Sequence, residues 1–153
     1  MSPRAAWRLE AAGFGPVYHY VAGKSDWLAA DLPFEGSARL AGAFTRREVA
    51  TASEDTTAQE ALRRLHARVF GPVVVLNQAG VVMGTVRREQ LESAAEGTSA
   101  GALRRFGVST VRPSEQAADL AHRMGHAQVT RVVVTRSDGT LVGLFFAEDL
   151  RQR

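Results

Sequence analysis

The stretch "RVVVTRSDGTLVGLFFAEDL", residues 131–150, contains two apolar runs joined by a turn. The runs "RVVVTR" (131–136) and "LVGLFF" (141–146) have the length of strands, and their nearly unbroken apolar cores favour burial on both faces. Gly139 ends the connecting "RSDG" and is free to take the positive φ that tight turns need. A short helix is expected near the closing "AEDL". The stretch therefore predicts a strand–turn–strand–helix unit.

The same pattern occurs 59 residues earlier in the chain. Residues 41–91 align with residues 100–150 without a gap and are identical at 15 of 51 positions. The identities include the valine triplets at 73–75 and 132–134, and the glycine pair Gly84/Gly143. Because the matched residues include glycines and apolar residues on which a fold depends, the match indicates an internal duplication.

Each copy predicts the element order β-α-β-β-α. In the first copy, "EVATA" (48–52) precedes a helix "TAQEALRRLHARV" (57–69), with Asp55 or Thr56 as its cap, and strands and a short helix follow. In the second copy, "GVSTV" leads to Pro113, Ser114 and a helix "EQAADLAHRM" (115–124). One unit of about 50 residues buries too little surface to fold alone, so we expect the two copies to pack together.

This repeated unit resembles a tandem pair of cystathionine-β-synthase (CBS) domains, a Bateman module, over about residues 38–153. The resemblance implies an α+β fold in which two repeats, 37–95 and 96–153, pack sheet to sheet about a pseudo-twofold axis. It also implies a regulatory module rather than an enzyme, with clefts between the repeats for AMP, ADP, ATP or S-adenosylmethionine. A homodimer and a regulated partner protein of unknown identity are further expectations from the resemblance.

The first 36 residues do not fit the repeat. Ser2 and Pro3 predict a helix start. "FGPVYHYV" (14–21) predicts a strand, and "GKSDWLAADLP" (23–33) a helix that Pro33 ends. This segment is similar to the C-terminal end of a rhodanese-type sulfurtransferase domain. The chain contains no cysteine, so it cannot carry a persulfide, and no sulfurtransferase activity is expected. The segment either packs against the module or supplies docking residues, namely Trp7, Tyr20 and Trp27.

The resemblance places ligand contacts at a pattern "G-h-h-T/S-x-x-D" after the second strand, where the hydroxyl meets phosphate and the carboxylate grips ribose. In the second copy the pattern reads "GLFFAED", which puts Phe146 at the hydroxyl position and Asp149 at the acid position. In the first copy it reads "GTVRREQ", with Arg87 and Gln90 at these positions. Arg87 either binds phosphate or fills the cleft. Asp149 either grips a ribose or serves only as an acid in the first turn of a helix.

Three further ligand positions follow from the resemblance. Thr51 and Thr110 stand where members of the family contact the base or its surroundings. Arg131, before the second valine triplet, stands where a basic side chain reaches phosphates. Its counterpart in the first copy, Pro72, cannot bind a phosphate in this way. The two clefts are therefore expected to be unequal.

Composition narrows the remaining functions. The 153-residue chain is 45% hydrophobic and 23% charged, as in globular proteins. Its formal charge is +3 and its basic residues occur as scattered arginine pairs, typical of a solvated surface or of local anion sites. A nucleic-acid surface would need denser clustering. No membrane span or secretory signal is expected, and the absence of cysteine suits a cytoplasmic protein.

No set of residues builds a catalytic site. His122 and His126 are four residues apart on one expected helix, a spacing that metals use, but no third ligand is evident and ordinary helix residues are the expectation. The sequence therefore favours a regulatory adenosyl-ligand sensor. The alternative is a scaffold for dimerisation or protein interaction whose clefts are filled by its own side chains.

Overall fold

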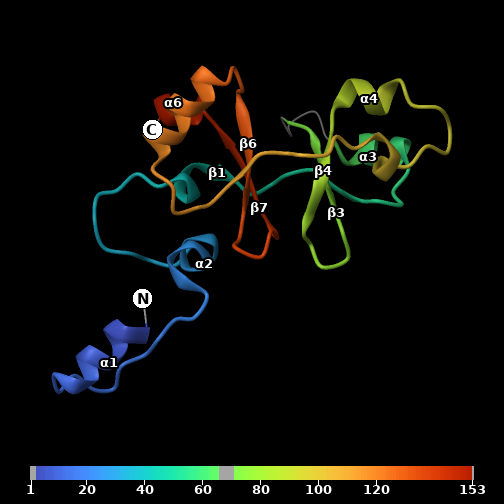
Figure 1. Ribbon diagram of the computed structural model, residues 1–153. Helices are drawn as coiled ribbons and strands as arrows, with labels where there is room; N and C mark the ends of the chain where they lie inside the picture. Colours follow the sequence, from blue (N-terminus) through green and yellow to red (C-terminus); the bar gives the residue numbers. More distant parts are fainter. Residues whose placement is uncertain (1–2, 66–70, 153) are drawn as a thin grey trace.

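The computed structural model describes residues 3–65 and 71–152, and it consists of two lobes, each built on a small sheet (Figure 1). One lobe contains β3, β4, α3 and α4, and the other contains β6, β7 and α6. The expected α+β architecture of two β-α-β-β-α repeats is confirmed.

The first repeat forms a three-stranded sheet in the order β2-β3-β4. Its elements are β2 (Thr51–Ser53), α3 (Ala58–Arg64), β3 (Val73–Leu76), β4 (Val82–Val86) and α4 (Arg88–Glu92). β2 runs parallel to β3, while β3 and β4 form an antiparallel hairpin. The hairpin turns at Gly80, whose φ is +77°, as the turn chemistry predicts.

The second repeat forms a four-stranded sheet in the order β1-β7-β6-β5. Its own elements are β5 (Thr110–Val111), α6 (Ala117–His126), β6 (Arg131–Thr135), β7 (Leu141–Phe146) and α7 (Asp149–Gln152). The fourth strand, β1 (Thr45–Arg46), comes from the start of the first repeat, together with the 3-10 helix η1 (Ala41–Phe44).

This exchange is reciprocal between the repeats. Arg46 pairs with Leu144 of the second sheet, and the equivalent Arg105, after α5 (Ala100–Leu103), pairs with Thr85 of the first sheet. A Cβ on Gly84 would lie 2.7 Å from the Arg105 carbonyl oxygen. Gly143 faces the Arg46 backbone in the same way, so the matched glycines allow each incoming segment to cross the other repeat's sheet.

The valine triplets divide their side chains between two cores. Val73 and Val75 pack under the helices of the first repeat, and Val132 and Val134 pack under those of the second. The middle residues, Val74 and Val133, meet between the two sheets with Leu144 and Phe146. Burial on both faces is therefore confirmed, and the apolar seam between the sheets explains why neither repeat needs to fold alone.

Helix starts differ slightly from the sequence expectation. Thr57, not Asp55 or Thr56, caps α3, since its hydroxyl accepts the Glu60 backbone N–H at 3.3 Å. Gln116 precedes α6 without a capping side chain. The last residues of the expected first-copy helix, 66–69, lie outside the described part of the chain.

The N-terminal segment contains two helices, α1 (Pro3–Ala11) and α2 (Gly23–Ala29), without the strand expected over 14–21. That expectation is wrong because its alternating aromatics have no sheet edge to pair with, and Tyr18 is 80% exposed. α2 ends at Ala29 rather than at Pro33, with a left-handed residue at Asp31 (φ +58°).

α2 docks on the second repeat, while α1 projects away from both lobes (Figure 1). Ala29 joins the core of the second repeat. Asp26 accepts a hydrogen bond from Arg136 at 2.5 Å, and Arg47 donates to the Ala29 carbonyl oxygen at 2.8 Å. The expectation that part of this segment packs on the module is thus confirmed for α2.

Candidate functional site: a cleft between the repeats

A cavity of about 540 Å³ lies between the two repeats. The second repeat supplies its apolar floor, which consists of Val111, Leu120, Met124, Val133 and Leu144. Hydroxyl groups of Thr85, Ser109 and Thr130 also line it. The volume lies within the range of about 300–1,000 Å³ that holds small organic ligands. An apolar floor with a few polar groups suits a flat heterocycle that carries a polar substituent.

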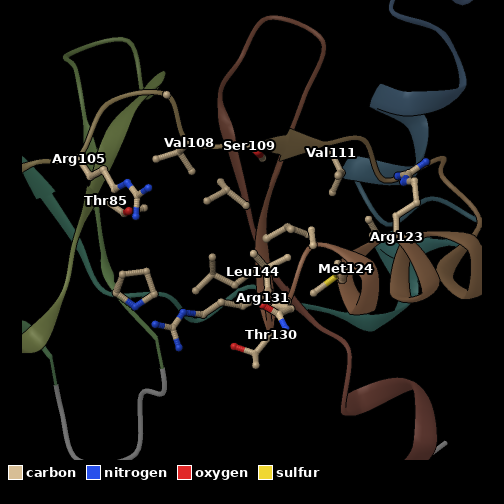
Figure 2. Close-up of a pocket in the computed structure, with 18 of the residues that line it drawn as sticks. Thr85, Arg105, Val108, Ser109, Val111, Arg123, Met124, Thr130, Arg131 and Leu144 are labelled. Atoms are coloured by element: carbon tan, nitrogen blue, oxygen red, sulfur yellow. The ribbon is translucent and has the colours of Figure 1, made fainter.

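Four arginines surround this floor: Arg87, Arg105, Arg123 and Arg131. Arg87 follows β4, Arg105 belongs to the segment that crosses from repeat to repeat, Arg123 lies on α6, and Arg131 begins β6. In Figure 2, Arg105 and Thr85 lie on one side of the cavity, Arg131 lies below its middle, and Val111, Met124 and Arg123 lie on the other side.

The charges of three of these arginines are not balanced locally. Arg123 pairs with Glu115, but no ion pair or side-chain hydrogen bond joins the guanidinium groups of Arg87, Arg105 or Arg131 to another described residue. No aspartate or glutamate is among the residues described as lining the cavity. A guanidinium group can donate to two oxygens of one phosphate at once, so these arginines suit the cavity to an anion.

Gln90, at the position of the ribose-binding acid, is used internally. Its Oε1 accepts the Arg87 backbone N–H at 3.0 Å, and its Nε2 donates to the Leu103 carbonyl oxygen at 3.2 Å. These bonds hold the start of α4 against the end of α5. Gln90 is not among the lining residues, so it positions Arg87 rather than facing the cavity.

The pseudo-equivalent place around Asp149 is occupied by Arg46. The Arg46 guanidinium donates to both carboxylate oxygens of Asp149, at 2.7 Å from Nε and 2.5 Å from Nη2. Its carbon Cζ lies 4.3 Å from the centroid of the Phe146 ring, and Phe146 is only 5% exposed. The hydrogen bonds from Arg46 to Asp149 raise the pKa of Arg46.

In this arrangement the Asp149 carboxylate is already hydrogen-bonded to the Arg46 side chain. A carboxylate that already accepts a bidentate guanidinium has fewer lone pairs left for a ribose diol. Phe146 packs in the seam between the sheets. The corresponding positions of the two repeats therefore differ: Arg87 lines the cavity beside Gln90, whereas in the other repeat Arg46 is bonded to Asp149 and lies over the ring of Phe146.

The two threonines lie away from the described cavity. Thr51 pairs with Val74 in the first sheet, and its carbonyl oxygen accepts a hydrogen bond from Arg64 at 3.4 Å. Thr110 is exposed at the start of β5, whereas its neighbours Ser109 and Val111 line the cavity. Alternate residues of an extended segment face opposite sides, which accounts for the difference.

Of the residues predicted to bind ligand, Arg87 and Arg131 thus share the cavity. Arg105, Arg123 and Ser109 also line it, although the sequence expectation did not name them as ligand residues. A signal for Arg105 was present, because Arg104 and Arg105 form one of the arginine pairs for which a local anion site was one of the two interpretations, beside a solvated surface. Arg123 is identical to Arg64 in the aligned copy, which marks it as part of the repeat without indicating its role.

The described residues indicate neither metal binding nor insertion into a membrane. His122 and His126 lie on the exposed surface of α6 with their Nε2 atoms 3.3 Å apart. Across residues 3–65 and 71–152, no group of three or more histidine or acidic side chains is placed to hold a metal ion. In the same part of the chain, no helix combines the length and the apolar character needed to cross a bilayer.

The sequence matches the family model described as "CBS domain" twice, over residues 41–97 and 104–153. These two matches cover most of the chain, and they coincide with the two structural repeats. The protein therefore belongs to the CBS domain family and carries a tandem CBS pair. No curated protein matches the sequence.

Solved structures show the same fold. The cytosolic domain of the Mg²⁺ channel MgtE in complex with ATP is 24% identical with a TM-score of 0.68, and the match covers 74% of this chain and 48% of that one. CBSX2 in complex with AMP is 21% identical with a TM-score of 0.64, covering 74% and 93%. This chain thus spans about half the length of the MgtE domain but nearly all of CBSX2.

A third structure extends over the N-terminal segment. The cystathionine beta-synthase pair domain of SO5017 from Shewanella oneidensis MR-1 is 17% identical with a TM-score of 0.66. That match covers 99% of this chain and 88% of the other. The fold similarity to that structure therefore extends over the N-terminal segment, whereas the similarity to a rhodanese tail stays a prediction.

Proposed function

We propose that the protein is a regulatory module that binds an adenine nucleotide in the arginine-lined cleft between its CBS repeats. The observation that carries this proposal is the combination, in one cavity of about 540 Å³, of an apolar floor with three guanidinium groups that have no anionic partner within the described part of the chain. The floor accommodates a base and the arginines accommodate phosphates. The ATP in the MgtE domain and the AMP in CBSX2 support this choice of ligand class.

Regulation follows from the position of the cleft. Its walls come from both repeats: Thr85 and Arg87 belong to the first, and Arg123 and Arg131 to the second. A ligand that contacts both walls binds one relative placement of the repeats better than another, and it shifts the population toward that placement. Such a shift would be transmitted to a partner protein or to a second copy of the chain. Homodimerisation, cytoplasmic localisation and the existence of a regulated partner protein stay predictions.

The regulatory role is preferred to a catalytic one, because CBS domains are regulatory modules and the described residues that line the cleft include no aspartate, glutamate, histidine or lysine. The scaffold alternative draws on a specific observation, the filling of the Asp149 side by Arg46 and Phe146. The open arginine-lined cleft favours ligand binding over a scaffold whose clefts are both filled.

A thermal-shift panel tests the proposal, using AMP, ADP, ATP, S-adenosylmethionine and GTP as a non-adenine control. Binding at about 100 times the dissociation constant stabilises the folded protein by about 2.7 kcal/mol. For a chain of this size, the melting temperature should then rise by about 5–10 °C. No rise with any adenosyl ligand would exclude the proposed function and leave the scaffold.

A further inference from the structure

The cleft that carries the proposed function is lined by positive charge: four arginines line it, and no carboxylate is among its described lining residues. A ribose diol is best held by a carboxylate, which accepts two hydrogen bonds at once. Here the residue at the acid position, Gln90, is bonded to the Arg87 backbone and to Leu103. The residue at the acid position of the other repeat, Asp149, is bonded to Arg46.

The uncompensated charge also determines which ligands are favoured. Arg87, Arg105 and Arg131 place three like charges around one cavity, an arrangement that repels itself until an anion enters. A ligand with one phosphate offsets part of this charge, and a chain of two or three phosphates can reach several guanidinium groups. A ligand with a positive sulfonium and ammonium group meets no acid among the described lining residues.

The geometry accommodates such a ligand along its length. Val111 and Met124 lie on one side of the cavity and Arg105 lies on the other, with Arg131 between them (Figure 2). A base against Val111 and Met124 would direct its phosphates toward Arg131 and Arg105. Thr85 and Ser109, which carry hydroxyl groups, also line the cavity.

We infer that this cleft selects its ligand by polyphosphate charge and not by ribose hydroxyls. This inference rests on the proposed function and adds the ligand class: a nucleoside di- or triphosphate. The nucleoside monophosphate and S-adenosylmethionine bind more weakly, and the 2′-deoxy nucleotide binds as well as its ribose counterpart.

Isothermal titration of the full chain, with divalent cations omitted, tests the inference with ATP, 2′-deoxy-ATP, AMP, S-adenosylmethionine and tripolyphosphate. ATP should bind at least about tenfold more tightly than AMP, because charge-assisted hydrogen bonds to the extra phosphates are made only by ATP. 2′-Deoxy-ATP should bind within about threefold of ATP, because no ribose-gripping carboxylate is lost. Tripolyphosphate should compete with ATP.

Variants assign the effect to the cleft. Arg131→Gln and Arg105→Gln should each weaken ATP binding about tenfold by removing charged hydrogen bonds. They should change AMP binding less. Arg63→Gln is the matched control, since Arg63 is exposed on α3 and pairs with Glu60 outside the cavity. The melting temperature of each variant shows whether it is folded.

The outcomes separate the inference from the proposed function. If AMP or S-adenosylmethionine binds as tightly as ATP, or if 2′-deoxy-ATP binds more than about tenfold more weakly, the cleft is an adenosyl site that reads ribose, and only the charge inference is overturned. If tripolyphosphate binds as tightly as ATP and adenosine contributes nothing, the adenine part of the proposed function is overturned. If nothing binds, both are overturned.

Discussion

The bidentate pair between Arg46 and Asp149 allows the role of Asp149 to be tested by mutation. Asp149→Ala removes two charge-assisted hydrogen bonds, of 2.7 and 2.5 Å, that join the start of the first repeat to the end of the second. The Arg46 side chain is 37% exposed and that of Asp149 16%, so solvent screens part of the interaction. We expect the free energy of unfolding to fall by about 1–2 kcal/mol after this discount.

The assay is thermal unfolding with and without ATP. A loss of about 1–2 kcal/mol should lower the melting temperature by about 3–6 °C for a chain of this size. The control is Glu148→Ala, because Glu148 contacts the same guanidinium at 3.2 Å but is 63% exposed. This exposed pair should contribute under about 0.5 kcal/mol.

The same variant distinguishes a structural from a ligand-binding Asp149. Because Arg46 already occupies this carboxylate, ATP should raise the melting temperature of Asp149→Ala as much as it raises that of the unchanged protein. Two results would refute the reasoning: an Asp149→Ala protein as stable as the Glu148→Ala control, or one that no longer responds to ATP. The second result would restore Asp149 as a ribose-binding residue.

Two further predictions concern the fold and its pH dependence. Gly84→Ala should lower the free energy of unfolding by about 1–3 kcal/mol, because the new Cβ would lie 2.7 Å from the Arg105 carbonyl oxygen. Gly125→Ala should raise it by about 0.5–1 kcal/mol, because Gly125 lies on α6 with open space around it. Urea unfolding measures both changes. Hydrogen bonds from Tyr20 and Arg136 lower the pKa of Asp26 below its ordinary value of 3.8, so the stability that Asp26 contributes is present above this value and is lost as the pH falls through the lowered pKa. The stability difference between the unchanged protein and Asp26→Asn should therefore shrink on acidification in this range, and a difference that grows would contradict the assignment.

The order of elements could be predicted from the sequence because it depends on local signals. Apolar runs, helical periodicity and the glycines of the two hairpins recur at the same positions in both copies, so each copy supports the interpretation of the other. The predicted strand over 14–21 lacked such a second copy. Its alternating aromatics match a strand, but a strand also needs a neighbour, which depends on tertiary structure.

The exchange of segments between the repeats could not be predicted from periodicity. β1 has two residues, and Arg105 makes only an isolated bridge. Both segments are too short to show the alternation of apolar and polar residues that marks a strand. The trace of the exchange in the sequence is the identical pair Gly84/Gly143, which shows close backbone approach without naming the approaching segment.

The candidate site was predictable only in part for a related reason. Arg87 and Arg131 follow from the resemblance to a known family, but the pairing of Arg46 with Asp149 joins side chains 103 positions apart. The sequence shows a carboxylate at the expected position, but it does not show whether a ligand or another side chain of the protein binds that carboxylate. The unequal clefts were expected, whereas the residue that fills one of them became evident from the fold.

The stoichiometry of ATP binding to the unchanged chain tests the central claim most directly. The account predicts one ATP per chain in isothermal titration, because the arginine-lined cavity between the repeats is open, whereas Arg46 already occupies the Asp149 carboxylate at the corresponding place. Two equivalent ATP molecules per chain would show that the Asp149 side also binds ligand. No binding would contradict the proposed function itself.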